Sequence, residues 1–140
     1  MILQLLVGGA ASLANIAIHS AWTVYLDRAV EKHWIAHKQV GVLPHRVVMM
    51  VATVAILMLG HIAEVMVWGA VYAAMGATPA GASSVYLAFV NYTTLGYGDV
   101  LPLTKWQLLG PLTALNDILL IGWSTAIIFE VVRTTHRGGT

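Results

Sequence analysis

Apolar residues dominate three long stretches of the chain, which polar residues separate. The stretches are Ile2–Leu26, Val47–Met75 and Leu108–Val132. The first holds no charged residue apart from a histidine, and the other two hold two or three ionisable residues each. Each stretch exceeds the roughly 20 residues that a helix needs to cross about 30 Å of hydrocarbon. The pattern therefore predicts three transmembrane helices.

The first apolar stretch also has to be compared with a signal peptide. It lacks a basic segment in front, and its apolar part is too long for one. We therefore expect a retained helix. Ser12, Asn15 and His19 fall at helical spacing on one side of it, which predicts that this side faces protein.

A shorter helix is expected between the second and third stretches. Ser83 or Ser84 can cap a helix that runs to about Thr93, and Pro79 marks its approach. Such a helix of 10–12 residues is about 15–18 Å long, half the thickness of a bilayer. This length predicts a re-entrant helix, which enters the membrane and returns to the same side.

The positive charges indicate the orientation in the membrane. Most lie between the first two stretches or near the C-terminus: Arg28, Lys32, Lys38, Arg46, Arg133 and Arg137. Only Lys105 lies between the second and third stretches. Positive residues favour the cytoplasmic side. We therefore expect the N-terminus outside, Asp27–Arg46 inside as a short polar helix or loop, residues 76–107 outside and the C-terminus inside.

The composition agrees with a membrane protein and excludes several functions. Of the 140 residues, 59% are hydrophobic and 9% are charged, whereas a soluble domain has about a quarter charged residues. The net charge of +1 and the lack of a basic patch argue against nucleic acid as a partner. The chain has no cysteine, so it has no disulfide or thiol chemistry. With no nucleophile–base arrangement and no cofactor motif in the sequence, we expect neither an enzyme nor a cofactor.

Residues 93–99, directly after the expected short helix, read Thr-Thr-Leu-Gly-Tyr-Gly-Asp. A dehydrated cation in a bilayer needs replacement oxygens, and successive backbone carbonyls supply them only if all point toward one axis. That conformation alternates between left- and right-handed backbone regions, and glycine enters the left-handed region at little steric cost. Gly96 and Gly98 suit the alternating positions, and the Thr94 hydroxyl can add an oxygen. One chain supplies only one such strand, so a ring requires several copies.

This heptapeptide, bracketed by apolar spans, resembles the selectivity filter of potassium channels, the established example of carbonyl-based ion selectivity. The resemblance implies four chains around one pore and a row of potassium sites formed by Thr94, Leu95, Gly96, Tyr97 and Gly98. Leu95 stands where valine is commoner. The alternative, a Gly-Tyr-Gly turn between packed helices, fits the flanking spans less well.

The resemblance extends over about residues 60–132, where the chain is similar to small bacterial potassium-channel-like membrane proteins. The residues that carry it outside the filter include His61, Glu64, Trp68, Tyr72, Tyr86, Trp106, Asn116, Gly122, Trp123, Ser124 and Thr125. The resemblance implies that Thr93 and Asp99 support the filter and its outer mouth, with Tyr86 or Trp106 as hydrogen-bond donors. Val90 stands where an acidic partner is usual.

Asp117 lies within the third span, where a carboxylate is costly and usually faces a cavity or a partner. Two placements are open. Asp117 can line the pore with Thr113, Ser124 and Ile128, which fall roughly on the same helix face, and concentrate cations there. Alternatively, it can be hydrogen-bonded behind the filter, to a tyrosine or an asparagine. Gly122 is a candidate gating flex point, although glycines in membrane helices usually serve close packing.

His61 and Glu64 lie one turn apart on the second span. A metal site is weakly indicated, because the pair offers only two ligands. A proton sensor is possible, because histidine titrates near neutral pH. The simplest interpretation is a buried polar pair that contacts the first span, for example through His19.

The sequence therefore predicts an all-α membrane protein with three transmembrane helices per chain, a re-entrant pore helix and a selectivity-filter loop, assembled as a homotetramer. Residues 1–46 form an extra N-terminal helix and a basic cytoplasmic loop, 47–135 the pore domain and 136–140 a cytoplasmic tail. The expected function is passive potassium conduction across a cell membrane, with potassium ions and the lipid bilayer as partners. A weakly selective cation channel and a non-conducting structural or partner-binding subunit are the alternatives.

Overall fold

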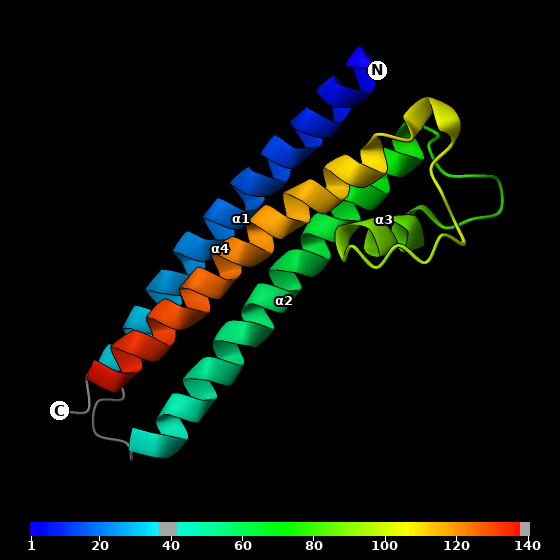
Figure 1. Ribbon diagram of the computed structural model, residues 1–140. Coiled ribbons are helices and arrows are strands. Elements are labelled where there is room, and N and C mark those ends of the chain that lie inside the picture. Colours follow the sequence, from blue (N-terminus) through cyan, green and yellow to red (C-terminus); the bar gives the residue numbers. More distant parts are fainter. Residues whose placement is uncertain (37–41, 138–140) are drawn as a thin grey trace.

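The computed structural model describes residues 1–36 and 42–137 (Figure 1). All elements of this part are helical: α1 (Ile2–Ala36), α2 (Val42–Ala74), α3 (Ser84–Tyr92), the short 3-10 helix η1 (Thr104–Trp106) and α4 (Leu109–Arg137). In the described residues, three segments are long and apolar enough to cross a membrane: Ile2–Val30, Val47–Ala74 and Thr104–Arg133. They confirm the three predicted spans.

The helix ends differ from the prediction. The expectation of a separate short helix or loop from Asp27 onward is wrong as far as Ala36, because α1 continues through this stretch. Asp27–Ala36 has no glycine or proline and is rich in residues that favour helices, so nothing in it ends the helix. Likewise, α2 already begins at Val42 and α4 continues to Arg137. Residues 37–41 of the expected basic loop (Asp27–Arg46) and residues 138–140 of the expected tail (136–140) lie outside the described part.

The three long helices run alongside one another, and the short α3 lies against one side of this bundle (Figure 1). α1 packs against α2 and α4, and α3 also packs against these two helices. α1 begins at the end of the bundle where α2 ends and α4 begins. The first span therefore packs on the other two spans of its own chain.

The segment between α2 and α4 leaves one end of the bundle and returns to the same end. The Leu103 amide donates to the Ala77 carbonyl at 2.8 Å. This hydrogen bond joins the two ends of the connecting segment. The Ser83 side chain accepts from the Tyr86 amide at 3.3 Å and caps α3, as predicted for one of the two candidate serines. The expected short helix is therefore present, with α3 ending at Tyr92.

The larger apolar core lies beside α3. Trp68 and Tyr72 of α2 are fully buried there, against Leu87 of α3 and Leu109 of α4. Closely packed, bulky side chains restrict movement of the backbone that they contact. The core therefore holds α3 firmly against the spans and positions the chain that follows it.

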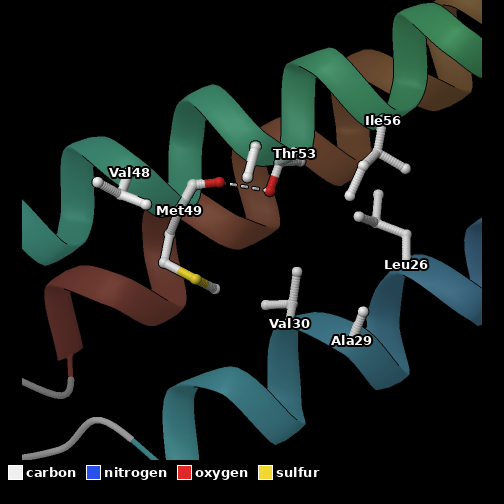
Figure 2. Close-up of a pocket in the computed structure, with 8 residues that line it drawn as sticks. Leu26, Ala29, Val30, Val48, Met49, Thr53 and Ile56 are labelled. Atoms are coloured by element: carbon white, nitrogen blue, oxygen red, sulfur yellow. Dashed lines mark hydrogen bonds between the residues drawn. The ribbon is translucent and has the colours of Figure 1, made fainter.

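Packing is looser where the last turns of α1 face the first turns of α2. A cavity of about 220 Å³ lies between these helices. Figure 2 shows it between Leu26, Ala29 and Val30 of α1 and, on α2, Val48, Met49, Thr53 and Ile56. The Thr53 hydroxyl donates to the Met49 carbonyl of its own helix at 2.8 Å. The surface offered to the cavity is consequently almost wholly apolar.

Candidate functional site

Residues 93–99 form an irregular segment directly after α3 whose backbone alternates in handedness. Positive φ angles occur at Thr94 (55°), Gly96 (55°) and Gly98 (77°). The left-handed conformation expected of the two glycines is therefore confirmed. Thr94 shares it, although this region is unfavourable for a residue with a Cβ atom.

Backbone hydrogen bonds to α3 hold the strained start of this segment. The Thr94 amide donates to the Asn91 carbonyl and the Leu95 amide to the Val90 carbonyl, both at 3.1 Å. The Gly96 amide also points to the Val90 carbonyl, at 3.4 Å. These bonds explain how the surrounding structure can keep Thr94 at a positive φ.

The side chains of residues 93–99 are exposed in the single chain. The exposed fraction is 52% for Leu95 and 69% for Tyr97. An added Cβ at Gly98 would meet no atom within 4 Å, and at Gly96 only the Thr94 carbonyl oxygen at 4.0 Å. Substitution of either glycine is therefore opposed by backbone strain and not by crowding.

One of the two predicted donors contacts Asp99. The Tyr86 hydroxyl, from the first turn of α3, donates to the Asp99 carboxylate at 2.6 Å. This hydrogen bond to a carboxylate raises the pKa of the Tyr86 phenol above its ordinary value, with a smaller contribution from desolvation. Trp106 is buried, and its indole N–H has no hydrogen-bond partner among the described residues. Asp99 is therefore tied back to α3 by Tyr86.

Behind this segment, Glu64 is the centre of a buried polar cluster. One carboxylate oxygen lies 2.8 Å from Nδ1 of His19, and the other lies 3.1 Å from Nδ1 of His61. The Tyr92 hydroxyl donates to Oε2 of Glu64, which is also the oxygen nearest to His61. The His61–Glu64 pair thus contacts the first span through His19, as the simplest interpretation of the sequence expects.

Ser124 completes this group, which we call the Glu64 cluster: His19, His61, Glu64, Tyr92 and Ser124. Nε2 of His61 lies 2.9 Å from the Ser124 hydroxyl, and Nδ1 of His61 lies 2.8 Å from the Tyr92 hydroxyl. The cluster joins side chains of α1, α2, α3 and α4. Sequence reasoning singled out the other members but missed Tyr92, because a tyrosine at the end of an apolar helix carries no local signal of its partners.

Further buried hydrogen bonds lie in layers nearer the end of the bundle where α4 begins. The Asn15 side-chain amide and the Trp68 indole N–H both donate to the Asn116 side-chain oxygen at 3.2 Å. Tyr72 pairs with Thr113 at 2.9 Å. Polar groups inside a membrane protein need such internal partners, because lipid offers none. The Asn15 contact here and the His19 contact in the Glu64 cluster confirm that this side of α1 faces protein.

Asp117 is 1% exposed and lies beside Tyr92 within its own chain. It lines a cavity of about 380 Å³ together with His61, Tyr92 and Thr93. Its Oδ1 atom has no hydrogen-bond partner among the described residues. The side chain is thus buried against Tyr92 and is not part of the exposed surface of the chain. The placement of Asp117 therefore favours the second alternative, a carboxylate behind the segment 93–99.

Two other candidates on α4 are placed differently. Ser124 is buried in the Glu64 cluster, on the inward face of the helix. Gly122 lies on an exposed side, where an added Cβ would meet no atom within 4 Å. Gly122 is therefore not required for close packing within the described part of the chain, and the flex-point interpretation stays a prediction.

A family model described as "Ion channel" matches residues 60–134, more than half of the chain. Searches among curated proteins and among solved structures returned no match. The matched part covers the second half of α2 from residue 60 onward, all of α3, the segment 93–99 and most of α4, and it leaves α1 outside. Helices able to cross a membrane, as found here, are what such a family requires. The chain therefore belongs to the ion channel family, in its two-span, potassium-channel-like pore group.

Proposed function

We propose that this protein is a homotetrameric, potassium-selective channel that conducts potassium passively. The ion sites are formed by the backbone of Thr94, Leu95, Gly96, Tyr97 and Gly98, with the Thr94 hydroxyl at the inner end. Family membership supports an ion channel in a membrane. Potassium selectivity, the filter and the tetramer are the proposal.

The observation that carries the proposal is the alternation of backbone handedness at Thr94, Gly96 and Gly98. In a regular strand, successive carbonyls point to opposite sides. Alternation between left- and right-handed conformations turns neighbouring carbonyls toward the same side. A row of carbonyls on one side can replace the hydration shell of a potassium ion when several strands face one another.

The exposure of this segment supports an assembly of several chains. One strand offers oxygens from one direction only, whereas the carbonyl ring of a potassium filter is built from four strands. Leu95 and Tyr97 are exposed apolar and aromatic side chains beside the row. Neighbouring copies would cover them, and Tyr97 would then brace the filter from outside.

The connecting segment closed by the Leu103–Ala77 hydrogen bond suits a re-entrant pore helix. α3 ends at the segment 93–99, so the negative end of its dipole lies near the proposed ion path and favours a cation there. The charge bias of the sequence orients the protein with its N-terminus and filter mouth outside. Arg28 and Lys32, both exposed near the end of α1, then lie on the cytoplasmic side of a bacterial cell membrane.

A weakly selective cation channel is the second candidate, favoured by Val90. This buried valine provides an apolar side chain at the position where the family commonly has a carboxyl group. The Tyr86–Asp99 bond is then the main side-chain brace of the filter. A less braced filter can widen and lose discrimination between potassium and sodium.

The test is cation flux through the purified protein in liposomes, with potassium compared against sodium. The key variant is Gly96→Ala, which strains a left-handed position by about 1–2 kcal/mol. The matched control is Gly9→Ala on α1, where φ is not positive and an added Cβ meets no atom within 4 Å.

We expect potassium flux to exceed sodium flux, to vanish in Gly96→Ala and to persist in Gly9→Ala. Equal fluxes that still vanish in Gly96→Ala would support the weakly selective channel. An absence of flux across a range of pH and voltage would favour the structural subunit. Native mass spectrometry tests the assembly separately. We expect four copies of the 15.0 kDa chain, and a monomer or dimer would contradict the proposal.

A further inference from the structure

The Glu64 cluster holds a set of metal-ligating groups that the proposed conduction does not use. His19, His61 and Glu64 each offer one ligand atom, and these atoms all lie within 4.8 Å of one another. We propose that the three side chains bind a divalent transition-metal ion, Zn²⁺ foremost, between α1 and α2. The sequence alone offered two of the ligands, and the fold adds His19 as the third.

The donor set suits zinc. Two imidazoles and one carboxylate are an established zinc-binding combination, which leaves a fourth position for water or another group. Imidazole ligands also select against Mg²⁺ and Ca²⁺, which prefer oxygen. In a tetrahedral site with bonds of about 2.0–2.1 Å, neighbouring ligand atoms lie about 3.3 Å apart.

The observed separations are close to this value. Oε1 of Glu64 lies 2.8 Å from Nδ1 of His19, and Oε2 lies 3.1 Å from Nδ1 of His61. One ligand atom from each of the three residues lies within 4.8 Å of the other two. Opening these contacts by a few tenths of an ångström makes room for the ion.

The surrounding groups orient the imidazoles for this role. With Nδ1 of each histidine directed at the ion, the Nε2–H groups are free to donate. The Ser124 hydroxyl lies 2.9 Å from Nε2 of His61 and 3.5 Å from Nε2 of His19, where it can accept from both. Outer partners of this kind fix the ring orientation of metal-bound histidines. The Tyr92 hydroxyl, 2.8 Å from Nδ1 of His61, lies where a fourth ligand can bind.

An access route leads to the site. His61 is the least buried of the three ligands, with 20% of its side chain exposed. It lines the cavity of about 380 Å³ that Asp117 also lines. Asp117 is the acidic residue among those that line this largely apolar cavity. A cation can therefore reach His61 from this cavity.

Bound metal would cross-link the first span to the second, next to the filter. His19 belongs to α1, and Tyr92, hydrogen-bonded to Glu64, directly precedes Thr93. The rival occupant of the cluster is a set of protons that bridge the same atoms. Protons account for the same short contacts but produce no stoichiometric metal binding.

The experiment measures binding and does not depend on conduction. The purified full-length protein, with any affinity tag removed and after chelator treatment, is titrated with Zn²⁺ by isothermal calorimetry. Visible absorption with Co²⁺ then reports the coordination geometry. We expect one Zn²⁺ per chain at micromolar or tighter affinity and the intense bands of tetrahedral Co²⁺. We expect His19→Gln and His61→Gln to abolish both signals.

Ser124→Ala provides a milder variant, which keeps all three ligands and should weaken affinity about 10–100-fold. The control is His136→Gln, about 18 Å farther along α4 than Ser124. It should bind like the wild type. Helix content by circular dichroism identifies variants that fail to fold. Wild-type binding weaker than millimolar, or Zn²⁺ affinity unchanged in a folded His19→Gln or Ser124→Ala variant, would overturn the proposal, whether or not the protein conducts potassium.

Discussion

The Tyr92 hydroxyl, at the last residue of α3, donates a hydrogen bond to the Glu64 carboxylate in α2. Thr93 follows directly, so this bond holds the point from which the proposed filter starts. Glu64 also contacts His19 of α1 at 2.8 Å. One buried carboxylate therefore joins the additional first span to the start of the proposed filter.

Removal of the Tyr92 hydroxyl should destabilise the protein. In Tyr92→Phe the carboxylate loses its hydroxyl donor but keeps both histidines. We expect the free energy of unfolding to fall by about 1–3 kcal/mol. Reversible unfolding in mixed micelles measures it. Tyr25→Phe, at an exposed position of α1, is the control and should change it by less than about 0.5 kcal/mol. Equal effects of the two substitutions would show that the Tyr92–Glu64 bond contributes nothing.

The Tyr86–Asp99 bond should be visible in an alkaline titration. Because Asp99 raises the pKa of the Tyr86 phenol, the bond is fully present below the ordinary phenol pKa of about 10. It is lost as pH rises through the raised value. The ultraviolet difference between wild type and Tyr86→Phe isolates this phenol, and we expect it to titrate later than a free tyrosine. In Asp99→Asn the midpoint should return toward 10. An unchanged midpoint in Asp99→Asn would show that Asp99 does not cause the raised pKa of the Tyr86 phenol.

Gly60 of α2 should be intolerant of a larger side chain. An added Cβ would lie 2.9 Å from Cδ1 of Trp22, whose indole N–H donates to the Ile56 carbonyl at 2.8 Å. Because a rigid ring has to move, we expect Gly60→Ala to lower the free energy of unfolding by about 1–3 kcal/mol. Gly9→Ala, in open space, should be neutral or gain up to about 1 kcal/mol. If Gly60→Ala were as stable as Gly9→Ala, the α1–α2 contact described here would be incorrect.

Neutralisation of Asp117 should leave block by internal divalent cations unchanged. The side chain is buried within its own chain, so in Asp117→Asn the charge lining the proposed central pore should stay the same. Potassium currents recorded over a series of internal Mg²⁺ concentrations measure the block. A clear loss of block in the variant would return Asp117 to the pore, the other alternative left open by the sequence.

Features that depend on short segments followed from the sequence. The three spans could be identified from runs of apolar residues, because hydrocarbon thickness sets the length that such a run must have. The start of α3 followed from the capping serines, and the left-handed positions of Gly96 and Gly98 followed from their missing Cβ atoms. Charged, helix-favouring residues after Leu26 were less informative, because they suit either a surface loop or the continued α1 that is observed.

Features that depend on contacts between distant residues were decided by the tertiary structure. His19 and Glu64 are 45 residues apart, and His19 and Ser124 are 105 apart, yet they meet in one cluster. Asp117 was identified as a costly intramembrane carboxylate from the sequence, but its inward direction depends on how α4 is rotated against α2 and α3. The sequence by itself determined which segments cross the membrane and where the backbone can adopt left-handed angles, because these are local properties of residues. Only packing of the helices decided which polar faces meet, because the rotation of each helix is set by all of its neighbours together.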